Sequence, residues 1–155
     1  MTPRLKLAQR LALAVPALLL AGAYLSEYGF GLFPCEMCWW QRYPHFAGVA
    51  LALVSTLAQP KRVWIALAAL AVLASGLIGA FHAGVEYGWW EGLTSCASNV
   101  DPGIDPLEAI MNAPLVRCDV APWTLAGISL AGFNALVSVT SAVAIFVLVA
   151  KDGRT

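Results

Sequence analysis

Residues 63–81 read VWIALAALAVLASGLIGAF and contain no charged side chain. A helix of this length and composition can cross the hydrocarbon core of a bilayer, which is roughly 30 Å thick and needs about 20 apolar residues. Three other apolar stretches flank it along the chain, and the first of them is interrupted by Ser26-Glu27. We therefore expect an all-α membrane protein, a four-transmembrane-helix bundle with helices near residues 11–33, 35–58, 63–82 and 123–150.

The composition supports a membrane protein of one domain. Of the 155 residues, 60% are hydrophobic and 12% are charged, and the mean hydropathy is +0.75. Soluble domains are about one-quarter charged. Nine basic residues balance nine acidic residues, so no positive field is available for nucleic acid, and we expect no nucleic-acid binding. No internal repeat or linker divides residues 1–155.

The charges predict the orientation, because Lys and Arg accumulate on the cytoplasmic side of a membrane. Seven basic residues fall on one side of the expected helices, and only two fall on the other: Arg42 and Arg117. The outer side, with the segments 29–43 and 83–122 and the adjoining Glu27 and Trp123, holds eight of nine acidic residues and five of six tryptophans. We expect both termini to be cytoplasmic. The alternative, in which Ala21-Gly22-Ala23 ends a cleaved signal peptide, leaves the outer segments outside.

All four cysteines fall in these outer segments, where disulfides persist. Cys35 and Cys38 form a C-x-x-C motif, which constrains little chain but suits reversible dithiol exchange. Cys96 and Cys118 lie 22 positions apart in the long loop, and either a structural or a redox disulfide fits them. A zinc site would normally use two closely spaced pairs, so we expect no metal.

A stripe of polar residues follows the C-x-x-C motif. If the second helix begins near Pro34, Cys38 lies in its first turn, where the helix dipole favours a thiolate. Gln41, Arg42 and His45 follow at i+3, i+4 and i+7 on the same side. Polar side chains at membrane depth usually mark function; the alternative is that Arg42 extends to the interface as an anchor.

One cysteine pair at the membrane boundary and another on an aqueous loop suggest an electron relay. A soluble dithiol would reduce the loop pair, which would reduce the boundary pair, and a lipophilic quinone would accept the electrons. Either ubiquinone or menaquinone would serve, and Arg42 could stabilise charge on its oxygen. His82, at the outer end of the third helix, could contact the quinone or hold a proton, or act only as an anchor.

The long loop contains one further recognisable element. Residues 105–111 read DPLEAIM, in which Asp105 suits an N-cap, Pro106 a first helical position and Glu108 the reciprocal capping acid. The apolar face that follows predicts a short interfacial helix in the second outer loop; an ordering turn is the alternative.

Together these motifs resemble one known family. The strings PCEMCWWQR at 34–42 and FHAGVE at 81–86, followed by Cys96 and Cys118, resemble the disulfide bond formation protein B family, DsbB. The resemblance implies a quinone-linked thiol oxidase of the bacterial inner membrane that regenerates a periplasmic thioredoxin-like oxidant of DsbA type. Its expected partners are therefore that protein, membrane lipid and a quinone.

The resemblance also implies roles for the motif residues. Cys96 and Cys118 would meet the soluble partner, with Cys96 as the site of the mixed disulfide. Cys35 would exchange with the loop cysteines, and Cys38 would engage the quinone beside Arg42. Gln41 and His82 also match family positions, and we expect both of them, together with His45 and Arg42, to bind the quinone.

Three other classes of membrane protein share some of these features. Vitamin K epoxide reductase-like proteins have the two cysteine pairs in the opposite order. A transporter would need more helices and paired charges near the midplane. A non-enzymatic membrane scaffold with two structural disulfides is the remaining alternative, and cysteine exchange with a mild dithiol separates it from a relay.

Overall fold

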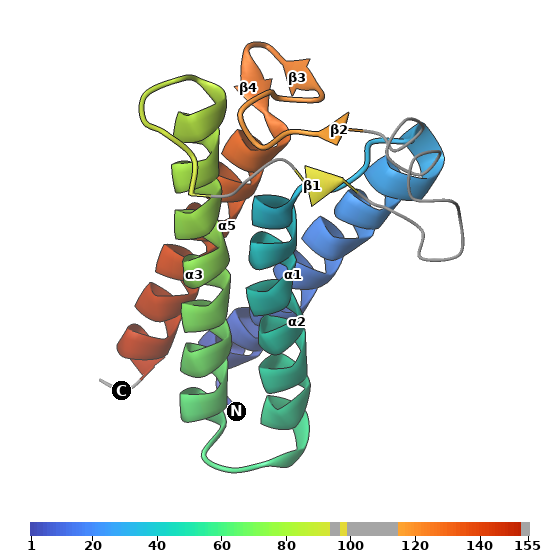
Figure 1. Cartoon of the computed structure of the whole chain (residues 1–155). Coiled ribbons are helices and arrows are strands. Elements are labelled where there is room, and N and C mark those ends of the chain that lie inside the picture. Colours follow the sequence, from blue (N-terminus) through green and yellow to red (C-terminus); the bar gives the residue numbers. More distant parts are fainter. Residues whose placement is uncertain (94–96, 99–114, 153–155) are drawn as a thin grey trace.

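Four long helices form the protein in the computed structural model, which describes residues 1–93, 97–98 and 115–152. They are α1 (Pro3–Phe30), α2 (Glu36–Leu57), α3 (Lys61–Glu86) and α5 (Leu130–Asp152). The expected all-α architecture with four long helices is confirmed. Figure 1 shows both termini and the α2–α3 connection at one end of the bundle, and α1 diverging from α2 toward the other end.

Two short strand pairs lie at the end opposite the termini (Figure 1). Strand β1 (Ala97–Ser98) pairs antiparallel with β2 (Leu115–Val116), with residue 97 opposite residue 116. Strand β3 (Thr124–Leu125) pairs antiparallel with β4 (Ile128–Ser129). The two pairs carry the chain between α3 and α5 back across this end of the bundle.

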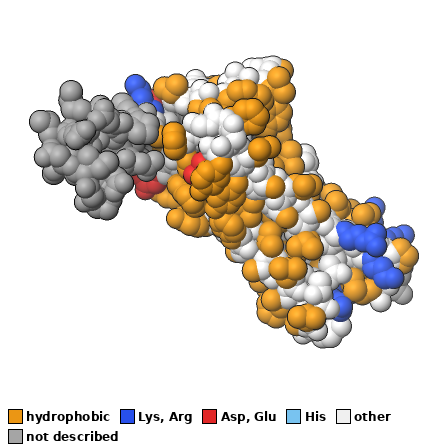
Figure 2. Space-filling model, turned by 90° about the vertical axis from the view of Figure 1, so that its right-hand side faces the viewer, with side chains coloured by type: hydrophobic (Ala, Val, Ile, Leu, Met, Phe, Trp, Pro, Cys, Tyr) orange, Lys and Arg blue, Asp and Glu red, His pale blue; other side chains and the backbone are white. Residues whose placement is uncertain are grey.

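Three of the described helices, α1, α3 and α5, are long and apolar enough to cross a membrane, which indicates a multi-pass membrane protein. Helix α2 is less apolar because it carries Gln41, Arg42 and His45, yet all three side chains are buried. Large apolar side chains are instead exposed on the outer surface, as lipid contact requires; they include Leu18, Leu57, Leu77 and Leu136. Figure 2 shows hydrophobic side chains over the middle of one face and Lys and Arg gathered at one end.

The first two helices begin and end where the local sequence provides caps. The side chain of Thr2 accepts a hydrogen bond from the backbone N–H of Leu5, and Pro3 occupies the first turn of α1. Gly31, with φ of 68°, ends α1 in the left-handed conformation that glycine tolerates best. Four residues later Cys35 caps α2, so the chain turns directly from one helix into the next.

The last helix begins later than expected. We predicted a helix from residue 123, but α5 begins at Leu130 because residues 124–129 form the β3–β4 hairpin. Its turn residues, Ala126 and Gly127, have φ of 51° and 78°, a pair of positive values that suits a tight hairpin turn. The third helix continues to Glu86, so residues 83–86 are helical. The expected interfacial helix at 105–111 lies outside the described residues.

Small residues let the helices approach closely. Helix α3 packs against both α2 and α5, and α1 packs against α2 and α5. A Cβ atom at Gly76 of α3 would lie 2.9 Å from Ser138 Cβ and 2.9 Å from Val139 Cγ2 on α5. Because membrane helices associate mainly through close packing and hydrogen bonds, this contact is a principal attachment of α5 to α3.

Gly76→Ala should separate α3 from α5. We expect it to destabilise the folded protein by about 1–3 kcal/mol through overpacking, measured as thermal unfolding in detergent. Gly22→Ala is the matched control, since a Cβ at Gly22 meets nothing within 4 Å. Equal stability of the two variants would show that the α3–α5 contact is not close-packed.

Candidate active site

The C-x-x-C motif forms the N-terminus of α2. Cys35 is the N-cap, and its Sγ accepts a hydrogen bond from the backbone N–H of Cys38 at 3.3 Å. The two sulfur atoms are 2.9 Å apart. Cys35 is buried and Cys38 is half-buried. The first turn of a helix has partial positive charge, so this position stabilises a thiolate at Cys38.

Cys118 from the outer loop lies in the same buried cluster as Cys35, together with Met37 and Val85. The hydrogen bond to Cys38, followed by burial, raises the pKa of the Cys35 thiol, and a hydrogen bond with Cys118 acts in the same direction. The Cys35 thiol therefore keeps its proton, and its S–H group donates hydrogen bonds toward Cys38 and Cys118. The loop cysteine and the helix cysteine meet, as a thiol–disulfide exchange between them requires.

Cys96, the other loop cysteine, lies outside the described residues. The backbone around it is partly described, because Ala97 pairs with Val116 in the β1–β2 ladder. The segments that follow Cys96 and precede Cys118 therefore run side by side. Pairing of Cys96 with Cys118 stays a prediction.

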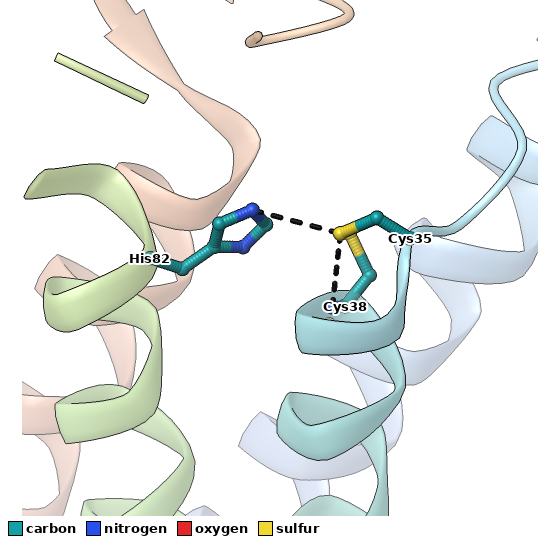
Figure 3. Close-up of side chains that lie close together, drawn as sticks. All are labelled: Cys35, Cys38 and His82. Atoms are coloured by element: carbon teal, nitrogen blue, oxygen red, sulfur yellow. Dashed lines mark hydrogen bonds between the residues drawn. The ribbon is translucent and has the colours of Figure 1, made fainter. Parts of the chain in front are cut away.

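His82 of α3 faces Cys35 across the gap between α3 and α2 (Figure 3). Its Nε2 is 3.6 Å from Cys35 Sγ and 3.2 Å from the carbonyl oxygen of Cys118. Its Nδ1 is 2.8 Å from Gln41 Nε2. One imidazole thus touches both cysteine-bearing segments and α2.

Gln41 determines which nitrogen of His82 carries the hydrogen. The amide nitrogen of Gln41 also donates to the carbonyl oxygen of Met37 at 3.1 Å, and its oxygen accepts from Asn134 Nδ2 at 2.8 Å. The group facing His82 Nδ1 is therefore an N–H donor, so Nδ1 accepts and Nε2 carries the hydrogen. His82 presents a fixed donor to Cys35.

The same residues are close enough to bind a metal ion, because the sulfurs of Cys35 and Cys38 and a ring nitrogen of His82 lie within 4.8 Å of one another. A histidine ligand offers a bare nitrogen to the metal and donates its other N–H to an acceptor. In His82 the nitrogen facing Cys35 carries the hydrogen, and the other nitrogen accepts. The hydrogen bonds thus favour a dithiol site over a resident metal.

Arg42 is held between α1 and α2. Its guanidinium pairs with Glu27 at 2.6 Å, and the two side chains are 7% and 12% exposed. It also donates to the carbonyl oxygen of Ala23 at 3.3 Å and lies 4.8 Å from the ring centroids of Tyr24 and Trp39. These two bonds use two of five N–H donors, so Arg42 can still bind another oxygen.

An apolar cavity of about 250 Å³ lies where α1 diverges from α2 and α5. Leucine side chains from α1 form much of its wall, with Phe33 and Phe133. Its polar lining residues are few and come from several helices: Cys38, Gln41, Arg42, His45, His82, Glu86 and Asn134. Apolar walls with a few converging polar groups are typical of a site for a lipophilic ring with polar substituents.

Comparison with known proteins agrees with this geometry. The family described as Disulfide bond formation protein DsbB matches residues 6–148. The chain belongs to the DsbB family. Disulfide bond formation protein B of Verminephrobacter eiseniae is 31% identical, with 99% of this chain and 89% of that protein covered. That of a Polaromonas species is 31% identical, with 92% and 89% covered.

A more distant relative is the Uncharacterized protein RP370 of Rickettsia prowazekii, which is 22% identical over 88% of this chain and 83% of that protein. No solved structure matches the chain significantly. The DsbB family is one of four-helix inner-membrane proteins, in line with the four long helices found here.

The structure brings together most of the predicted site residues and adds two that we did not predict. Glu27 pairs with Arg42, and Asn134 accepts a hydrogen bond from His45 Nε2 at 2.9 Å while it donates to Gln41. Each interrupts an otherwise apolar stretch. This interruption was the signal in the sequence that could have identified both residues, because polar side chains inside membrane helices need partners within the protein.

Glu27→Ala should destabilise this DsbB protein. It would leave the buried Arg42 guanidinium without its carboxylate, at a cost of about 3 kcal/mol, measured by thermal unfolding in detergent. Asp119→Ala is the control, since the Arg117–Asp119 side chains are 49% and 50% exposed, and exposed pairs contribute little. A small and equal effect in both variants would contradict a structural role for the Arg42–Glu27 pair.

Proposed function

We propose that the chain is a membrane thiol:quinone oxidoreductase that reoxidises a periplasmic thioredoxin-like disulfide donor of DsbA type. One observation carries the proposal: the Cys35–Cys38 motif contacts Cys118 of the outer loop on one side and the apolar cavity on the other. Membership of the DsbB family, whose role is disulfide bond formation, supports it.

Electrons would pass along the cysteines in the order in which they lie. The soluble dithiol would reduce a Cys96–Cys118 disulfide at the outer end. Cys118 would then exchange with Cys35, the cysteine in its cluster. Closing the Cys35–Cys38 disulfide would deliver two electrons to the cavity through Cys38, which lines it.

His82 would assist the exchange at Cys35. Its Nε2–H lies 3.6 Å from Cys35 Sγ, where it can stabilise negative charge on the sulfur when an S–S bond to Cys35 breaks. Gln41 acts through His82, because its hydrogen bonds to Met37, His82 and Asn134 use its amide. Gln41 is thus a positioning residue in this proposal.

The cavity fits a quinone. When bound there, a quinone would supply two-electron acceptor chemistry. Arg42 would hold one of its oxygens and stabilise negative charge, and the leucine-rich wall of α1 would contact the apolar ring and tail. His45 could hold a second polar group, because its buried Nδ1 has no hydrogen-bond partner among the described residues.

The charge distribution supports a cytoplasmic location for both termini. Lys and Arg side chains gather at one end of the molecule (Figure 2). The chain termini and the α2–α3 connection, with Lys61 and Arg62, share one end of the bundle. By the positive-inside rule this end faces the cytoplasm. Cys35, Cys38 and Cys118 would then face the periplasm of a bacterial inner membrane.

The decisive measurement is quinone reduction by the detergent-purified protein when it is given a reduced thioredoxin-like oxidant. Wild type should turn over, whereas Cys38→Ser and Cys96→Ser should lose activity at least 10²-fold, because each breaks one pair of the relay. Cys38→Ser should also accumulate a Cys35–Cys118 disulfide, detectable by mass spectrometry of peptides. Lack of turnover in wild type with both quinone types would favour a scaffold with static disulfides.

Arg42→Ala should impair quinone reduction and leave dithiol exchange intact. We expect quinone reduction to fall about 10²-fold, since one charge-stabilising donor is lost, while dithiol exchange at the loop cysteines persists. The exchange is followed by mixed-disulfide formation with the soluble partner. Lys151→Ala, which removes an exposed positive charge at the C-terminal end of α5, is the control for charge. Normal quinone kinetics in Arg42→Ala would contradict the assignment of Arg42.

A further inference from the structure

Glu86, the last residue of α3, is a buried acid that the relay does not use. Its side chain is 2% exposed, and its Oε2 has no hydrogen-bond partner among the described residues. The side chain of Ser129 hydrogen-bonds the carboxyl group. Burying a carboxyl group with one oxygen unpaired lowers the stability of the folded protein. This cost indicates that Glu86 has a function besides packing.

This carboxyl group lies between two cavities. Besides the apolar cavity, a second cavity of about 310 Å³ lies toward the outer loop and is lined by Cys35 and Arg117. Cys38, His82 and Glu86 line both cavities. Glu86 thus borders the space where the cysteines exchange and the space where the acceptor would bind.

The reaction requires a proton acceptor at this point. With Cys38 as the thiolate, closing the Cys35–Cys38 disulfide breaks the S–H bond of Cys35, forms one S–S bond and releases two electrons and one proton. Reduction of a quinone to a quinol would need both electrons, this proton and a second proton from solvent. A guanidinium and a carboxamide accept no proton, so Arg42, Gln41 and Asn134 are unsuitable. His82 is unsuitable as well, because Gln41 occupies its Nδ1 and its Nε2 already carries a hydrogen.

We propose that Glu86 accepts the proton that leaves the Cys35–Cys38 dithiol during oxidation and passes it into the apolar cavity beside Arg42. This inference rests on the proposed function. The carboxylate takes one proton, becomes a neutral acid, and returns to carboxylate when it releases the proton toward the reduced acceptor. His82 Nε2 lies 3.8 Å from Glu86 Oε1, so the two side chains are neighbours in this space without a hydrogen bond between them.

The titratable and charged groups that face Glu86 come from α2, from α3 and from the outer segments. They are Cys35, Cys38, Arg42, His45, His82 and Arg117, each of which lines one or both of the cavities that Glu86 borders. Of the side chains that line both cavities, Glu86 is the one with a buried oxygen that has no hydrogen-bond partner among the described residues.

His45 is the competing proton acceptor. Its Nε2 donates to Asn134 Oδ1, so its unpartnered Nδ1 is bare. However, His45 lies two helical turns beyond Cys38 and lines only the apolar cavity. It is therefore better placed to meet the acceptor than to receive a proton from the thiols.

The first test is single-turnover quinone reduction by the pre-reduced protein across pH. Glu86→Gln should slow the reaction roughly 10²-fold at pH 7 without changing the KM for quinone. The loss should shrink as the pH rises, because hydroxide in the solvent can then take the proton in place of Glu86. Glu86→Asp should recover part of the rate, which also shows that the site folds. Glu91→Gln, at an exposed carboxyl, should behave as wild type.

The second test needs no quinone. Infrared difference spectra between the disulfide and dithiol states, both prepared without quinone so that no acceptor takes the proton from Glu86, should show a protonated carboxyl group appearing on oxidation in wild type and Glu91→Gln, and not in Glu86→Gln. A signal that persists in Glu86→Gln, or an unchanged pH profile of that variant, would overturn the proposal. So would a rate loss in His45→Asn alone. Wild type that reduces no quinone would instead refute the proposed function, while the infrared signal still decides the role of Glu86.

Discussion

The arrangement depends on one chain of hydrogen bonds inside the bundle, which runs from His82 through Gln41 and Asn134 to His45. In lipid, a polar side chain has no water to bind, so each must find a partner within the protein. These four residues come from α2, α3 and α5 and hydrogen-bond one another in sequence, although the Nδ1 of His45 has no partner among the described residues. The same bonds that hold three helices in register also fix the ring of His82 toward Cys35.

The first helix is attached differently, and this difference creates the cavity. Near the chain termini, Leu5, Ala8 and Ala12 of α1 pack into the apolar core. Farther along, α1 diverges from α2 (Figure 1), and the Arg42–Glu27 pair links the two helices there. Close packing at one end and an ion pair at the other leave apolar space between them. That space opens directly beside Cys38.

The sequence predicted what local patterns determine. The lengths of the apolar stretches predicted four helices. The C-x-x-C motif and the polar stripe that follows it placed Cys38, Gln41 and Arg42 on one helix. The partners of these residues were not predictable, because Glu27 and Asn134 meet α2 only through tertiary packing. The start of α5 was wrong for a local reason: the sequence from 123 is apolar, yet Ala126-Gly127 turns it into a hairpin. Hydropathy reports burial in lipid and does not distinguish a helix from a short apolar hairpin.

The proposed function sets two requirements on the site that oppose each other. A cavity for a lipophilic acceptor must be dry and apolar, but oxidation of a dithiol releases protons as well as electrons. Electrons can move between atoms in contact, whereas a proton in an apolar space needs a basic side chain at every step. Most polar groups in the bundle are hydrogen-bonded to one another, and a group that is already hydrogen-bonded is not available as a proton acceptor. A dry thiol oxidase therefore has to leave a basic group incompletely paired near its cysteines, and Glu86 has that property.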